Sequence, residues 1–395
     1  MGAAKGLKAA ARHAGVLMKI AERVRSRQNN FDALRLIAAS LVLVSHCFPL
    51  TGRSDPFGAI SGQTLGELGV SIFFAISGFL IAKSWSDSRA VAPFALKRGL
   101  RLLPALVIAV LLTALVLGPL VTTLSPLRYF TSAEVYRYIA ENSALFTING
   151  RLPGVFVHNV YPSAVNGSLW TLPVEATAYV AAAILGAVGA LRGRVGLACV
   201  SFLALLALST PMAGVSSLQL GGAAGGDLAD VVYLGGLFNC GMLLYALCDR
   251  IALRWDVFVL FTIAWIASYD TVWVRPVAIV VIPYLVLVLA YRTPAAVRVI
   301  TRPGDVSYGI YVYAFPTQQL AAFVWGPGLT PGIMLGLVAA PVYLLALASW
   351  RLVEAPALGL KQRFLTKSDS IRPLPERFRR ITSPLTNAGE PRPLD

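Results

Sequence analysis

The sequence predicts an all-α polytopic membrane protein with about ten transmembrane helices. Of its 395 residues, 56% are hydrophobic and only 13% are charged, whereas soluble domains usually carry about 25% charged residues. Apolar runs of about 20 residues, the length that a helix needs to cross a bilayer core, recur along the whole chain. Too little polar sequence remains to cover a soluble domain of this size.

The predicted spans follow one another with short connections. Trp170, Trp255 and Trp350 lie near span ends, as expected of aromatic anchors at the membrane interface. Pro173 suits the first turn of a helix, so we expect the fourth span to enter its helix near Thr171. The ten ranges are 31–50, 67–83, 100–121, 168–190, 194–211, 230–248, 251–268, 273–291, 306–325 and 331–352.

The distribution of basic residues predicts the orientation. With the amino terminus inside, 28 of the 34 Lys and Arg residues lie in cytoplasmic segments, five lie outside and Arg35 lies in a span. This asymmetry is the positive-inside pattern, and it predicts that both termini are cytoplasmic. The net charge of +15 is explained by topology, so no nucleic-acid partner is expected.

Composition and hydropathy divide the sequence into three segments. Residues 1–30 predict a basic amphipathic helix on the inner membrane surface, since they lack the apolar core of a signal peptide. Residues 31–357 form the membrane domain, and the Pro- and Arg-rich residues 358–395 predict a disordered cytoplasmic tail. The four cysteines form no CxxC pattern, and we expect neither a metal site nor a disulfide framework.

The segment 122–167 is the longest predicted connection and is expected outside the membrane. At about 46 residues it is too long to be a bare turn. Its aromatic residues offer faces on which a sugar can stack, although packing on the membrane surface explains them equally well. They are Tyr129, Tyr136, Tyr138, Phe146 and Phe156.

Arg35 and His46 lie inside the first apolar run, "FDALRLIAASLVLVSH". Eleven residues make three helical turns, so the two side chains share a face, with His46 about 16 Å deeper than Arg35. Asp32 lies near the same face. Arg35 can simply reach the interface with Asp32 as its partner, and a buried histidine can be a core residue. Ionisable residues at this depth are costly, however, and favour a functional site.

Two further elements carry candidate site residues. Glu175, in "GSLWTLPVEATAY", is a carboxylate within a span, and it either serves the site or stabilises a helix amino terminus through the helix dipole. Arg98 and Arg101, in "LKRGLRLLPA", form a basic fork that can bind phosphates, or else anchor the topology. Ser77-Gly78, in "FFAISGFLI", indicates a helix break where close packing or a small turn is required.

These stretches together resemble the membrane-bound acyltransferase family 3, the bacterial sugar O-acyltransferases, from about residue 29 to about residue 357. The resemblance rests on six elements in order. They are Arg35-x10-His46, "FFAISGF" (73–79), Arg98-x-x-Arg101 followed by Leu-Leu-Pro, "SLWTLPVE" (168–175), "GDVSYGIYVYAFP" (304–316) and "VEAP" (353–356).

The resemblance implies transfer of an acyl group, commonly acetyl from acetyl-CoA, to a sugar hydroxyl of an envelope glycan or a lipid-linked saccharide. No cofactor would be bound permanently, because the acyl-CoA is the donor substrate. Arg98 and Arg101 would hold its phosphates. His46 would act as general base or acyl carrier, with Asp32, Arg35 and Glu175 completing the catalytic set. Such an enzyme would lie in the cytoplasmic (inner) membrane of a bacterium, surrounded by membrane lipids.

Two departures and one alternative accompany this resemblance. Many relatives carry a histidine where this chain has Ala314, and some append a soluble transferase domain that is absent here. The chain is therefore expected to act alone or with separate proteins of glycan assembly. The alternative is a multi-pass transporter in which the intramembrane His, Arg and Glu form a substrate or proton path. No inverted repeat supports that alternative.

Overall fold

The computed structural model describes residues 29–88, 90–145, 148–191, 193–209 and 227–360, together with Ile20, Ala21 and Val24. The surface helix predicted for residues 1–30 and the tail predicted for residues 358–395 lie almost entirely outside these ranges. The described part is helical and holds no β-strand, and an isolated bridge joins Thr122 to Val155. The predicted all-α class is therefore confirmed.

Each of the ten predicted spans coincides with a helix. The ten are α3 (Phe31–His46), α5 (Leu65–Ser88), α6 (Val91–Leu112), α10 (Thr171–Ala187), α11 (Gly193–Ser209), α12 (Leu228–Ala246), α13 (Trp255–Ala267), α14 (Val274–Arg292), α15 (Ser307–Trp325) and α16 (Pro331–Ser349). Helix α10 begins at Thr171, as Pro173 predicts.

Seven of these helices, or their continuous extensions, are long and apolar enough to cross a membrane. The apolar parts of α11 and α13 are shorter than a full span. Helix α15 has 19 residues, and its buried residues include polar Ser307, Gln318 and Gln319. The protein is thus a helical polytopic membrane protein, and the count of ten spans stays a prediction.

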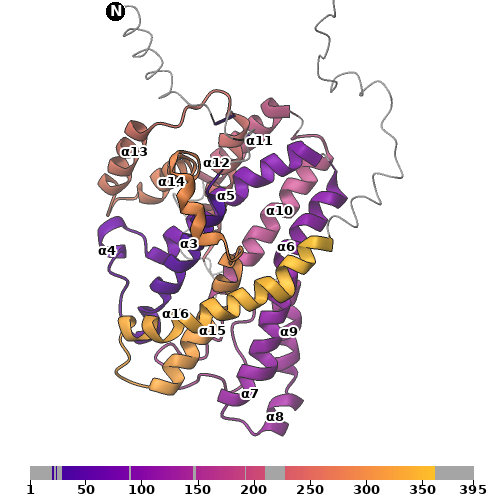
Figure 1. Cartoon of the computed structure of the whole chain (residues 1–395), viewed down its shortest axis with the longest axis vertical. Coiled ribbons are helices and arrows are strands. Elements are labelled where there is room, and N and C mark those ends of the chain that lie inside the picture. Colours follow the sequence, from indigo (N-terminus) through magenta and orange to yellow (C-terminus); the bar gives the residue numbers. More distant parts are fainter. Residues whose placement is uncertain are drawn as a thin grey trace, which may run out of the picture.

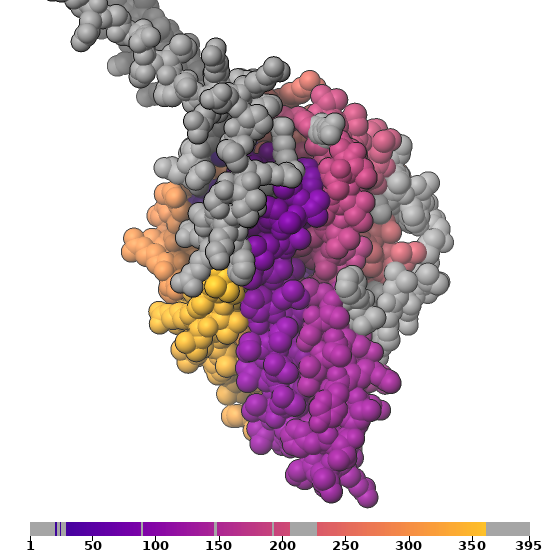
Figure 2. Space-filling view, turned by 90° about the vertical axis from the view of Figure 1, so that its right-hand side faces the viewer, coloured from indigo at the N-terminus to yellow at the C-terminus, as the bar shows by residue number. Residues whose placement is uncertain are grey.

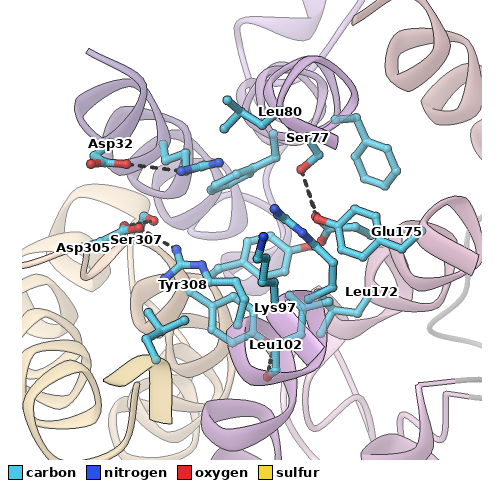
Figure 3. A pocket seen from close by; sticks show the side chains of 18 of the residues that line it. Asp32, Ser77, Leu80, Lys97, Leu102, Leu172, Glu175, Asp305, Ser307 and Tyr308 are labelled. Carbon is cyan, nitrogen blue, oxygen red and sulfur yellow. Dashed lines mark hydrogen bonds and ion pairs between the residues drawn. The ribbon is translucent and has the colours of Figure 1, made fainter. Parts of the chain in front are cut away.

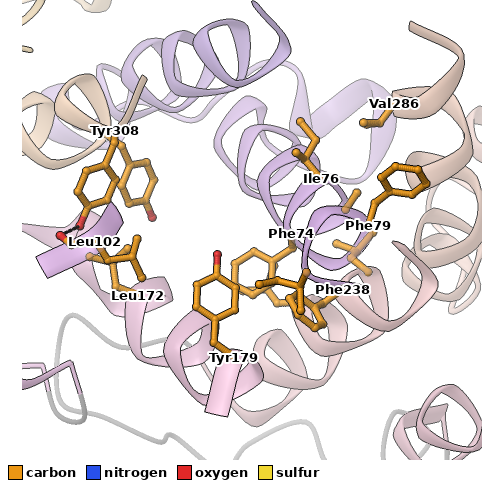
Figure 4. Packing of buried hydrophobic residues seen from close by; sticks show 14 of the residues in the cluster. Phe74, Ile76, Phe79, Leu102, Leu172, Tyr179, Phe238, Val286 and Tyr308 are labelled. Carbon is orange, nitrogen blue, oxygen red and sulfur yellow. Dashed lines mark hydrogen bonds between the residues drawn. The ribbon is translucent and has the colours of Figure 1, made fainter. Parts of the chain in front are cut away.

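Helices α3, α5 and α12 form the centre of the molecule (Figure 1). Helix α5 packs along both α3 and α12, while α15 packs between α3 and α16. Aromatic rings fill the centre: Phe79 of α5 contacts Phe31 of α3 and Tyr291 of α14. Figure 4 shows how Phe74, Phe79 and Phe238 pack around α5. These contacts fix α3 and α5, which carry several of the candidate site residues.

Gly78 lets α5 and α12 approach each other closely. A Cβ atom at Gly78 would lie 1.9 Å from the carbonyl oxygen of Phe238, and one at Gly241 would lie 2.4 Å from the carbonyl oxygen of Ala75. Helix α5 nevertheless runs unbroken from Leu65 to Ser88. The predicted break is therefore wrong, and the predicted close packing is confirmed. Backbones that approach through small residues are typical of membrane helix pairs.

The segment 122–167 contains two short helices, α8 (Pro126–Thr131) and α9 (Ala133–Ala144), that pack near the end of α6. Here α6 continues through a π-helical turn (η2, Thr113–Leu117) into α7 (Gly118–Val121). These elements project at one end of the molecule (Figures 1 and 2). The segment is thus a folded part of the protein rather than an open loop.

Three of the five aromatic residues singled out in this segment serve packing. Tyr129, Tyr138 and Phe156 are at most 1% exposed, and the Tyr129 hydroxyl donates a hydrogen bond to the Ala114 carbonyl at 2.7 Å. Their predicted role as sugar-stacking faces is therefore wrong, because the fold covers both faces of each ring. Tyr136 is 55% exposed, and Phe146 lies outside the described residues.

Candidate active site

A cavity of about 710 Å³ brings together five of the six predicted site residues. These five residues are Asp32, Arg35, Arg98, Arg101 and Glu175. We call this space the inner cavity. Figure 3 shows Asp32 and Asp305 on one side of it, Ser77 and Glu175 on the other, and Lys97 between them. Helices α3, α5, α6, α10 and α15 meet here with the segment 301–305 and with Trp350 and Leu358 beyond α16, so only the tertiary fold assembles the cluster.

Arg35 and Asp32 form an ion pair one turn apart on α3, with an N–O distance of 3.2 Å. Both side chains line the inner cavity. The Arg35 side chain is 18% exposed and that of Asp32 is 61% exposed. The ion pair agrees with the interpretation that Asp32 is simply the partner of Arg35 near the membrane interface. Both side chains also line the cavity, where they could contact a charged ligand.

Glu175 is held by side chains rather than by the start of its helix. It accepts a hydrogen bond from Ser77 Oγ at 2.9 Å and another from the Tyr179 hydroxyl. The helix amino terminus lies one turn earlier, at Thr171. The contacts therefore favour a role in the cavity wall over stabilisation of the helix dipole.

Arg98 points its guanidinium over the ring of Tyr179, 5.7 Å from the ring centroid. This cation–π contact leaves the charge uncompensated, and Arg98 forms no ion pair with a carboxylate in the part of the chain that the structure describes. Its Nε is buried and has no hydrogen-bond partner there. Arg98 is therefore suited to bind an anionic group that enters the cavity.

Arg101 is engaged within the protein. Its guanidinium lies 2.6 Å from Asp305 Oδ2 and 3.7 Å from Glu354 Oε2. Burial disfavours the charged form of Asp305, yet Arg101, together with Arg35 and a hydrogen bond from Ser307, holds the pKa of this carboxyl below its ordinary value. The two arginines of the predicted fork thus differ, because only Arg98 has its charge uncompensated.

The partners of Arg101 were not predicted from the sequence as site residues. Glu354 lies in η6 (Trp350–Glu354), a π-helical turn that continues α16, and such turns are frequent at functional sites. Gly304 has a φ of 137° and lets the chain pass so close to Trp350 that a Cβ atom would lie 2.1 Å from the indole nitrogen. Asp305 and Glu354 lie in the motifs "GDVSYGIYVYAFP" and "VEAP", which were singled out in the sequence. Their contact with Arg101 could not be predicted, because Arg101 and Asp305 are 204 positions apart.

His46 lines a second cavity of about 480 Å³, which we call the outer cavity. Its ring meets Phe315 of α15 edge to face at 5.1 Å. Val70 and Tyr311 line both cavities, so the two spaces adjoin across these two side chains. His46 therefore lies in a different cavity from the five charged residues. We call Val70 and Tyr311, which line both cavities, the wall.

A family model described as an acyltransferase domain matches residues 28–351 of this chain. The chain belongs to acyltransferase family 3. This acyltransferase is 31% identical to a protein named O-acetyl transferase from Shigella phage Sf6, over 87% of this chain and 97% of the phage protein. It is 32% identical to nodulation protein 10 of Rhizobium leguminosarum bv. viciae, over 89% and 98% of the two chains. No solved structure matches the chain.

Family membership makes the protein a membrane-bound O-acyltransferase and confirms the resemblance seen in its motifs. Ala314, which replaces the histidine of many relatives, is 1% exposed within an apolar cluster beside Leu43 and Cys47. One turn later, Gln318 donates hydrogen bonds to the Leu43 carbonyl at 2.8 Å and to Cys47 Sγ at 3.1 Å. In this acyltransferase, Gln318 therefore ties α15 to the end of α3 that carries His46.

Proposed function

We propose that this acyltransferase transfers an acetyl group from acetyl-CoA to a sugar hydroxyl of an envelope glycan or a lipid-linked saccharide. The observation that carries the proposal is the pair of adjoining cavities. One cavity is lined by Arg98 and Arg101 and the other by His46, with Val70 and Tyr311 lining both. The name of the phage relative, O-acetyl transferase, supports acetyl as the transferred group, and the glycan acceptor is what the family resemblance implies.

The inner cavity suits the donor. Coenzyme A carries phosphates, which bind best to cationic donors such as guanidinium groups. Arg98 offers an uncompensated charge, and Lys83 and Lys97 lie in the same lining. By the positive-inside pattern this side of the membrane is cytoplasmic, where acyl-CoA is made. The neutral arm of coenzyme A would then reach toward Val70 and Tyr311 and carry the thioester to the wall between the cavities.

The outer cavity suits the acceptor. A sugar hydroxyl beside His46 can lose its proton to the neutral imidazole as its oxygen attacks the thioester carbonyl. The C–O bond forms, the C–S bond breaks, and the leaving thiolate takes up a proton, which the imidazolium can supply. In this scheme His46 moves the proton and Arg98 holds the donor. Trp170 and Ser168 complete the lining on the acceptor side.

A transfer assay with purified components tests the proposal. The enzyme in lipid nanodiscs is given radiolabelled acetyl-CoA and the saccharide fraction of cells that lack the gene. We expect label to enter the saccharide with wild-type enzyme and not with His46→Ala. Unlabelled saccharide together with acetylated protein would show that the acceptor is a different molecule. Transfer from longer acyl-CoA but not from acetyl-CoA would contradict the proposed donor.

No observation favours the transporter alternative, because the chain belongs to an acyltransferase family. The same assay separates the two activities. A transporter would form no new ester bond, so the label would keep the mass of the added substrate.

A further inference from the structure

Ser168 lines the outer cavity and carries an unused hydroxyl group. The residue is 2% exposed and lines this cavity together with His46. Its Oγ is buried and has no hydrogen-bond partner among the residues that the structure describes. A buried polar group without a partner is costly, so most such groups in proteins are hydrogen-bonded. Because Ser168 also lines the outer cavity, a ligand bound there can supply the missing partner.

The backbone of Ser168 is held from both sides. Its N–H donates to Asn166 Oδ1 at 3.2 Å, and its carbonyl oxygen accepts a hydrogen bond from the Tyr311 hydroxyl at 2.7 Å. Asn166 in turn donates from Nδ2 to the Val312 carbonyl at 2.9 Å. These bonds join the start of the 3₁₀ turn η3 (Gly167–Trp170) to α15. The position of Ser168 is thus fixed, while its hydroxyl alone stays unpaired.

The neighbourhood brings Ser168 close to the reacting groups. Gly167 lies so near Phe315 that a Cβ atom would be 2.7 Å from the ring, and the same ring packs against His46. Tyr311, which binds the Ser168 carbonyl, belongs to the wall between the two cavities. Ser168 therefore contacts Tyr311 of the wall directly, and its neighbour Gly167 packs on the ring that contacts His46.

We propose that the Ser168 hydroxyl donates a hydrogen bond to the carbonyl oxygen of the acyl group during transfer. The inference rests on the proposed function. When the sugar oxygen attacks, the carbonyl π electrons move onto the carbonyl oxygen and make it an oxyanion. Ser168 stabilises this charge and keeps its own proton. The pair of electrons returns as the C–S bond breaks and the thiolate leaves.

Ser168 is poorly placed to be the nucleophile itself. An attacking serine needs a base hydrogen-bonded to its hydroxyl, and Ser168 Oγ has no partner of any kind in the described part of the chain. Oxyanion stabilisation needs no base, only a fixed donor. A single donor of this type is worth roughly 10²–10³-fold in kcat.

The test compares two serines that share burial and the lack of a partner. Ser201, on α11, is also fully buried with an unpartnered Oγ, but it lines neither cavity. Ser168→Ala, Ser168→Cys and Ser201→Ala are assayed in nanodiscs with radiolabelled acetyl-CoA and the saccharide fraction described above. Cysteine has nearly the size of serine but is a weak donor, so it preserves packing while it weakens the hydrogen bond.

We expect both Ser168 variants to lower kcat by about 10²–10³-fold while the Kd for acetyl-CoA stays near the wild-type value. Ser201→Ala should transfer at the wild-type rate. Wild-type kcat in Ser168→Cys at normal membrane abundance would overturn the inference, as would an acetyl group found on Ser168 by mass spectrometry of quenched enzyme. Weaker acetyl-CoA binding that accounts for the whole loss would also overturn it. If wild-type enzyme transfers no acetyl group, the proposed function fails and this inference fails with it.

Discussion

Replacing Arg101 with glutamine should destabilise the fold, whereas replacing Arg98 should weaken donor binding. Arg101 contacts Asp305 at 2.6 Å and Glu354 at 3.7 Å, and the side chains of these carboxylates are 15% and 3% exposed. Removing one member of such a buried group leaves uncompensated charge and costs about 3–5 kcal/mol. Arg101→Gln should therefore lower the unfolding temperature in detergent and reduce membrane abundance.

A combined variant separates the loss of charge balance from the loss of a ligand contact. In Arg101→Gln with Asp305→Asn and Glu354→Gln, no member of the group carries a charge. Since the uncompensated charges are gone, most of the stability lost in the single variant should return. The assays are thermal unfolding of the purified protein and equilibrium binding of acetyl-CoA.

Arg98→Gln is the matched counterpart, because Arg98 contacts the Tyr179 ring instead of a carboxylate. Charge-assisted hydrogen bonds contribute about 1.5–3 kcal/mol each, so affinity for acetyl-CoA should fall roughly tenfold to a hundredfold. The unfolding temperature should stay near that of wild type. The reasoning is refuted if Arg101→Gln unfolds like wild type and loses affinity, or if Arg98→Gln binds acetyl-CoA as tightly as wild type.

Three further predictions concern the catalytic base, the topology and the packing. His46→Ala and His46→Gln should each lower transfer by roughly 10²–10⁴-fold at normal membrane abundance, and a Gln variant with near-normal transfer would show that His46 is structural. Reporter fusions at Gly62, Ala90 and Gly150 should report outside, inside and outside; one reversed signal rejects the orientation. Gly78→Leu should prevent stable folding, because its Cβ would lie 1.9 Å from the Phe238 carbonyl oxygen, and normal yield of monodisperse protein would contradict the close packing.

The helices could be predicted from the sequence because hydropathy acts locally. A run of about 20 apolar residues has few alternatives to a helix in a bilayer, where every backbone group must be hydrogen-bonded internally. The error at Gly78 has the same origin. Glycine weakens helices in water, but in α5 it admits the backbone of α12, and the packing gained keeps the helix continuous. The helix propensity of a residue does not depend on helices far along the chain, so it could not reveal that Gly78 packs against α12.

The candidate site was predictable only in part. Polar residues in apolar spans pointed to Arg35, His46 and Glu175, because burial of such groups is expensive. The sequence could not separate Arg98 from Arg101, since the difference lies in carboxylates from distant segments. Nor could it distinguish Ser168 from other serines, because a missing hydrogen bond is a property of the folded surroundings.

The arrangement also explains why one span carries both a guanidinium and an imidazole. Arg35 and His46 lie three turns apart on α3, and the structure places them in different cavities that adjoin at Val70 and Tyr311. Phosphates cannot enter an apolar interior without large cost, so a charged donor must stop at the inner cavity while its neutral arm goes further. The acceptor hydroxyl must meet the arm from the other side. A helix that borders both spaces can hold charge at one end and move a proton at the other, provided that the wall between them is thin. Tyr311, fixed by its bond to Ser168 and packed edge to face on Phe73 at 5.8 Å, is one of the two side chains that line both cavities.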